Sequence, residues 1–159
     1  MACDGQATME SRVVKTAARK VHRIHDGSVL AGFSGGTADG VTLLERLEAN
    51  LAAHGALRQA AVELSREWRT DRALRRLEAV VVAVSEEALF LLTGEGDVIE
   101  PDDGLVGIGS GGGYAVSAAR ALLRHARLPL AEVAQEALRI AAEIDIYTND
   151  CVILETLTW

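Results

Sequence analysis

The sequence predicts an α+β fold, a four-layer α/β/β/α sandwich in which two sheets are each covered by a pair of helices. Three observations support this prediction. Strand-like and helix-like segments follow the order strands, two helices, strands, two helices, strand. Glycine-containing turns separate neighbouring strand-like segments, which favours antiparallel sheets. A chain of 159 residues with 49% hydrophobic content can bury one core, so we expect a single domain over residues 1–159.

The first half of the chain accounts for three strands and the first helix pair. Strand-like segments cover residues 11–16, 20–25 and 28–33. Asp26-Gly27 lies between the last two, and glycine tolerates the positive φ of a tight hairpin turn. Apolar residues then recur at helical spacing in two groups on either side of His54-Gly55. These groups are Leu43, Leu44, Leu47 and Leu51, and then Leu57, Ala61, Leu64 and Trp68.

The second half repeats the order of strands followed by two helices. Aliphatic and β-branched residues predict strands at residues 78–85, 89–93, 98–100 and 105–108. Helical spacing predicts helices over residues 114–124 and 131–143, and Pro129 suits the start of the second of these. Residues 151–157 are predicted to close the chain as a strand.

Composition narrows the range of functions. The net charge of −7 argues against nucleic acid as a partner, and the arginines at residues 72–76 are best explained as a solvated helix face. The longest apolar run, residues 79–84, is too short to cross a membrane, and no signal peptide opens the chain. Cys3 and Cys151 do not form a disulfide framework. We therefore expect a cytoplasmic protein.

Four sequence runs resemble a known family. Asp4-Gly5-Gln6-Ala7-Thr8 is followed by Val14-Lys15, by Arg19-Lys20-Val21, and then by Gly32-Phe33-Ser34-Gly35-Gly36-Thr37-Ala38-Asp39. This order and spacing are similar to those of HslV, the bacterial proteasome-like peptidase that works under the HslU unfoldase. The resemblance covers essentially the whole chain. It implies the N-terminal-nucleophile hydrolase fold and a threonine-type endopeptidase.

The same resemblance implies that the nucleophile is not among these residues. HslV chains open with a threonine, a strand and a turn before they reach the segment that matches Asp4 to Thr8. This sequence starts at Met1-Ala2-Cys3, inside that opening element. We expect a truncated first strand, with a threonine-headed segment encoded upstream. Because loss of a strand leaves buried backbone groups without partners, we expect residues 1–159 alone to be poorly stable and inactive.

The resemblance assigns catalytic roles to five residues of this chain. A terminal threonine supplies both a hydroxyl nucleophile and an α-amine that acts as a local base. Lys20 is implied to favour the deprotonated hydroxyl, and Asp4 to orient Lys20. The Gly35 amide is implied to donate to the oxyanion, and Ser110 to help move the proton of the α-amine. Many HslV chains carry cysteine where Asp145 stands, and here the chain resembles proteasome β-subunits instead, which implies that Asp145 supports the nucleophile.

Substrate and partners follow from the same resemblance. Thr8, Gly35 and Gly36 are implied to flank the substrate backbone and to hold it as an added strand. The implied substrates are proteins unfolded by the HslU ATPase hexamer, and the implied assembly is two stacked six-membered rings. No Gly-x4-Gly-Lys-Ser/Thr loop occurs in this sequence, so we expect nucleotide to bind to the partner and not to this subunit.

One metal site is implied as well. In HslV the loop that matches residues 142–148 can hold a sodium ion through main-chain carbonyls, and the matching positions are Ala142, Asp145 and Thr148. Thr148 is also implied to support the nucleophile together with Asp145, as in proteasome β-subunits. The sequence has no Cys/His cluster with zinc spacing.

Two other functions remain open at this point. A non-catalytic ring scaffold would keep the fold without the chemistry. A serine hydrolase would use Ser34, because Gly32-x-Ser34-x-Gly36 matches the nucleophile-elbow pattern and lies between a predicted strand and a predicted helix. Gly107-x-Gly109-x-x-Gly112 matches a dinucleotide-binding fingerprint, but a second helix follows where a strand would be needed.

Overall fold

The computed structural model describes residues 1–159 and divides the chain into two compact units. Unit 1 contains Met1–Val21 and Leu105–Thr156, and unit 2 contains His22–Gly104 and Leu157–Trp159. Each unit combines strands with a pair of helices. No helix combines the length and the apolar character needed to cross a membrane.

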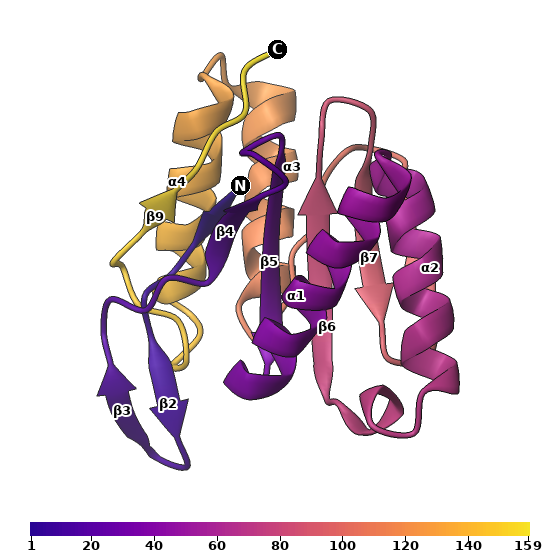
Figure 1. The fold of residues 1–159 in the computed structure, drawn as a ribbon. Coiled ribbons are helices and arrows are strands. Elements are labelled where there is room, and N and C mark those ends of the chain that lie inside the picture. Colours follow the sequence, from indigo (N-terminus) through magenta and orange to yellow (C-terminus); the bar gives the residue numbers. More distant parts are fainter. The chain divides into compact units, whose positions relative to one another are not determined.

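Unit 2 is built on a five-stranded sheet with the order β4-β5-β6-β7-β8. Neighbouring strands from β5 to β8 are antiparallel. Helices α1 (Thr37–His54) and α2 (Leu57–Thr70) lie side by side against β5, β6 and β7 (Figure 1). The strands are β4 (Val21–Ile24), β5 (Val29–Gly35), β6 (Ala79–Val84), β7 (Leu89–Thr93) and β8 (Val98–Ile99), and a short 3-10 helix, η1 (Leu74–Arg76), precedes β6.

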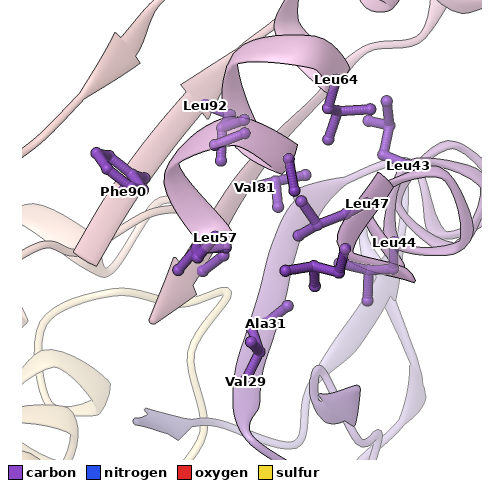
Figure 2. Close-up of a cluster of buried hydrophobic side chains, with 14 of the residues drawn as sticks. Val29, Ala31, Leu43, Leu44, Leu47, Leu57, Leu64, Val81, Phe90 and Leu92 are labelled. Carbon is purple, nitrogen blue, oxygen red and sulfur yellow. The ribbon is translucent and has the colours of Figure 1, made fainter. Parts of the chain in front are cut away.

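The core of unit 2 forms where the two helices meet the sheet (Figure 2). Leu43 and Leu47 of α1 and Leu64 of α2 are fully buried, because residues three or four apart share one face of a helix. Val81 and Leu92 extend from the sheet into the same cluster. This arrangement holds β5 and the start of α1 in place, and it thereby fixes the Gly35-Gly36 segment between them.

Unit 1 contains two short strand pairs and the second helix pair. Strand β1 (Ala2–Cys3) pairs antiparallel with β9 (Ile153–Leu154), and β2 (Ala7–Met9) forms a hairpin with β3 (Arg12–Lys15). Helices α3 (Gly112–His125) and α4 (Leu130–Ala142) pack against each other (Figure 1) through a small cluster of apolar side chains. The buried members of this cluster are Ala119, Val133 and Ala137.

Most of the elements expected from the sequence are present, and two expectations need correction. All four helices form, and the two with predicted ends, α3 and α4, lie within two residues of them. Gly55 ends α1 in the left-handed conformation at φ 75°. Residues 105–108 were expected to form a strand but form none, because Gly107 packs directly on Gly112 and pairs with no other strand. The closing strand is also shorter than expected, since only β9 finds a partner.

Candidate active site

Asp4 and Lys20 form a close ion pair in unit 1. Asp4 lies directly after β1 and Lys20 directly before β4. The Lys20 Nζ lies 2.7 Å from the Asp4 Oδ1, and the two side chains are 29% and 13% exposed. The other carboxylate oxygen of Asp4 accepts the N–H of Gln6 at 2.8 Å. Because both oxygens of Asp4 are engaged, the carboxylate holds the Lys20 ammonium in one direction.

Asp145 is the centre of a second cluster in unit 1. The hydroxyls of Ser110 and Thr148 both donate to its Oδ2, each at 2.6 Å, and the N–H of Tyr147 donates to its Oδ1 at 3.3 Å. Asp145 and Thr148 are each 9% exposed. A Cβ on Gly111 would lie 2.4 Å from the Thr148 Oγ1, so only glycine at this position leaves room for the Thr148 hydroxyl.

The charge of Lys20 reaches the Asp145 cluster. Burial raises the pKa of Asp145, but the hydrogen bonds from Ser110, Thr148 and Tyr147 and the positive charge of Lys20 outweigh burial and leave the pKa below its usual value of 3.8. Lys20 therefore acts on two carboxylates, Asp4 by direct contact and Asp145 through its charge. The structure thus brings together four of the five residues expected to be catalytic.

The lowered pKa of Asp145 predicts a particular dependence of stability on pH. A carboxyl whose pKa is lower in the folded chain stabilises the fold above its unfolded pKa, near 3.8, and loses that contribution as the pH falls through the folded pKa. We expect Asp145→Asn to reduce the free energy of unfolding by about 1–2 kcal/mol at pH 7, because charged acceptors form stronger hydrogen bonds.

Urea unfolding of the parent chain and of Asp145→Asn between pH 7 and pH 3 tests this prediction. The difference between their free energies of unfolding is expected to shrink as the pH falls below 4. A difference that stays constant across this range would contradict the lowered pKa of Asp145.

Gly35 is the fifth expected catalytic residue and lies in unit 2, at the end of β5. Its φ of +112° suits only glycine, and a Cβ there would lie 2.4 Å from the carbonyl oxygen of Glu78. Gly36 donates its N–H to that same oxygen at 3.2 Å. This bond makes Gly35 and Ala79 a non-hydrogen-bonded pair of the antiparallel ladder, so the Gly35 N–H points away from β6. Such an N–H can serve as an oxyanion donor.

The expected substrate-binding residues differ in what they offer. Gly36 donates its N–H to the Glu78 carbonyl and accepts the N–H of Gly40 with its own carbonyl. Its backbone groups are therefore less available than the Gly35 N–H for hydrogen bonds to a substrate strand. Thr8 lies on β2 in unit 1, and its hydroxyl accepts the Gln6 Nε2 at 3.1 Å. Whether Thr8 contacts substrate stays a prediction.

Ser34 lies in the wrong setting for a nucleophile elbow. It lies within strand β5 opposite Val80, whereas an elbow places the serine on the turn between strand and helix. No histidine forms a hydrogen bond with it. The geometry therefore favours the Asp4, Lys20 and Asp145 arrangement over a serine hydrolase.

Three polar residues that sequence reasoning did not assign also shape these clusters. Asp39, in the first turn of α1, accepts the N–H of Glu78 at 2.9 Å, and the carbonyl of the same residue contacts Gly35 and Gly36. Gln6 donates to the carbonyl of Ile146 at 3.0 Å, and Asn149 contacts three backbone segments. Gln6 and Asp39 belong to the runs that carry the family resemblance, and Asn149 directly follows Thr148, but no further sequence signal marked their contacts.

Comparison with known proteins agrees with this fold and site. The proteasome subunit family matches residues 1–157, and the chain belongs to that family. A protein of Syntrophobacter fumaroxidans (strain DSM 10017 / MPOB), named ATP-dependent protease subunit HslV, is 57% identical over 150 residues, which are 94% of this chain and 84% of that protein. The crystal structure of eukaryotic HslV from Trypanosoma brucei matches with a TM-score of 0.91 and 45% identity, over 97% of this chain and 90% of that one. The fold is thus the α+β fold of proteasome subunits, as expected.

Proposed function

We propose that this chain is the peptidase subunit of an ATP-dependent, proteasome-like protease of the cytoplasm, and that it cleaves proteins by threonine-type catalysis. The observation that carries this proposal is the Lys20 ammonium, which is held by Asp4 and whose charge reaches the buried Asp145 cluster. The 57% identity to a protein named ATP-dependent protease subunit HslV supports the same conclusion.

Each cluster has a part in the proposed chemistry. The nucleophile of this chemistry is an amino-terminal threonine, with its α-amine as local base. Lys20 lowers the energy of the deprotonated hydroxyl by its charge, and the Asp4 carboxylate orients the Lys20 ammonium. Ser110, which already donates to Asp145, relays the proton of the α-amine, and the Gly35 N–H stabilises the oxyanion.

The proposed partners supply what this subunit does not. An HslU-type ATPase hexamer unfolds substrate proteins and binds the nucleotide. Copies of this chain form two stacked six-membered rings that enclose the active sites. Enclosure limits access to unfolded chains, so a peptidase of broad specificity does not degrade folded proteins around it.

We propose that the turn after α4 is a sodium site. Sodium is a hard cation and prefers oxygen ligands. The carbonyl of Asp145 accepts the N–H of Thr148 at 3.1 Å and keeps a second lone pair, and Ala142 ends α4, where carbonyls lack helical partners. We propose that the carbonyls of Ala142, Asp145 and Thr148 hold a sodium ion there, which would stiffen the turn that carries Asp145.

The decisive experiment compares two proteins. The first is residues 1–159. The second, called the extended chain below, carries an added threonine-headed strand and turn ahead of Ala2. Each is mixed with an HslU-type ATPase and ATP, and the hydrolysis of a fluorogenic peptide is followed. We expect turnover only with the extended chain, and covalent labelling of its first threonine by an epoxyketone.

Two controls make this experiment specific. Replacing the first threonine of the extended chain by alanine is expected to abolish both turnover and labelling, because the alanine has no hydroxyl. Turnover by residues 1–159 alone would refute the assignment of the nucleophile. A well-assembled extended chain that hydrolyses nothing would leave a ring scaffold as the function.

A further inference from the structure

Asn149 uses both ends of its side-chain amide on distant backbone segments of unit 1. Its Oδ1 accepts the N–H of Gly5 at 2.9 Å and the N–H of Cys151 at 3.3 Å. Its Nδ2 donates to the carbonyl of Thr16 at 2.9 Å. The contacts to Gly5 and Thr16 span 144 and 133 positions of sequence, so this half-buried side chain joins parts of the chain that no local structure connects.

The segments that Asn149 joins are those that carry the two charged clusters. Gly5 directly follows Asp4, and the carbonyl of Gly5 accepts the N–H of Ala18 at 2.7 Å, two residues before Lys20. On the other side, Asn149 directly follows Thr148 in the loop that carries Asp145. Asn149 therefore fastens the segment of the Asp4–Lys20 pair to the loop of the Asp145 cluster.

We propose that Asn149 is a positioning residue that sets the placement of Lys20 relative to Asp145. This inference rests on the proposed function, because the placement matters for a reaction that uses both groups. Asparagine suits the role because one planar amide offers a donor for the Thr16 carbonyl and an acceptor for the Gly5 N–H. Aspartate has the same shape but no donor, and it would turn an oxygen toward the Thr16 carbonyl.

The kinetic test uses the extended chain with Asn149→Ala and Asn149→Asp. Both variants are expected to lower kcat by on the order of 10- to 100-fold with little change in KM, since misplaced catalytic groups cost rate more than binding. Asn149→Ala is expected to lower kcat much less when Asp145→Asn is already present. In that background the charged Asp145, against which Asn149 is proposed to place Lys20, is gone. Asn50→Ala is the matched control: it removes a buried amide from α1 in unit 2, and its kcat is expected to equal that of the parent.

A second readout does not depend on activity. Amide hydrogen exchange is measured in the parent and in Asn149→Ala for two groups of the joined segment. These are the Gly5 N–H, which donates to the Asn149 Oδ1, and the Ala18 N–H, which donates to the Gly5 carbonyl. Asn149→Ala is expected to speed exchange at both amides, and the control Asn50→Ala to leave both unchanged.

The outcomes separate this inference from the proposed function. If Asn149→Ala leaves hydrogen exchange at Gly5 and Ala18 unchanged, Asn149 does not hold the segment that carries Lys20 and the inference is overturned. If the parent extended chain hydrolyses no peptide, the proposed function fails, while hydrogen exchange still decides the role of Asn149.

Discussion

Replacing Lys20 by alanine in the extended chain is expected to reduce kcat for peptide hydrolysis by on the order of 10²–10⁴-fold. The ammonium lies 2.7 Å from Asp4, and its charge acts on Asp145, so its removal takes from the site the positive charge that the proposed chemistry uses. Steady-state hydrolysis of a fluorogenic peptide measures the effect. The free energy of unfolding is expected to change by only about 0–1 kcal/mol, because the pair is partly exposed.

Two further variants show that the effect belongs to this lysine. Lys20→Arg is expected not to restore kcat, because a guanidinium is longer than an ammonium and spreads its charge over three nitrogens. Lys15→Ala removes a lysine from the exposed hairpin strand β3 and is expected to keep the parent kcat. Parent-like turnover by Lys20→Ala would rule out the proposed chemistry.

Gly35→Ala is expected to damage both stability and catalysis. The new methyl group would lie 2.4 Å from the Glu78 carbonyl oxygen, and the backbone at φ +112° is strained for any residue with a Cβ. Left-handed strain alone is about 1–2 kcal/mol, and the contact with Glu78 adds to it. Relief of the contact turns the Gly35 N–H, so kcat is expected to fall by on the order of 10²–10³-fold.

A second glycine separates these two effects. Gly27 also has a positive φ, +84°, but a Cβ there meets no atom within 4 Å. Gly27→Ala is therefore expected to lower the free energy of unfolding by backbone strain alone and to keep kcat. Urea unfolding and peptide hydrolysis of both variants test this. Equal losses of kcat in the two would mean that strain, and not the donor at Gly35, explains the result.

Elements with strong local patterns were predictable from the sequence. Leu43, Leu47 and Leu51 repeat at helical spacing, and Gly55 ends that helix as expected. The segment at residues 105–108 was mispredicted, because an apolar run indicates a strand only where a partner strand is available. The hairpin strand β2 was missed, since Ala7–Met9 is short and pairs only with β3.

The site was predictable only in part. The motif residues Asp4, Lys20, Ser110 and Asp145 were identified by resemblance, and the structure brings them into one unit with the contacts described above. The role of Asn149 was not predictable. Its side chain acts on Gly5 and Thr16, more than 130 positions away in the sequence, and an asparagine after a threonine carries no signal of such contacts.

The sequence by itself indicated the four helices and most of the strands, because periodicity and residue type are local properties of the chain. Its resemblance to a known family supplied the candidate catalytic residues. Only the tertiary structure decided that Lys20 meets Asp4, that Ser110 and Thr148 share one oxygen of Asp145, and that the Gly35 N–H points away from β6. The physical reason is that hydrogen bonds and charges act over a few ångströms of space. Which residues come within that distance depends on how the whole chain packs.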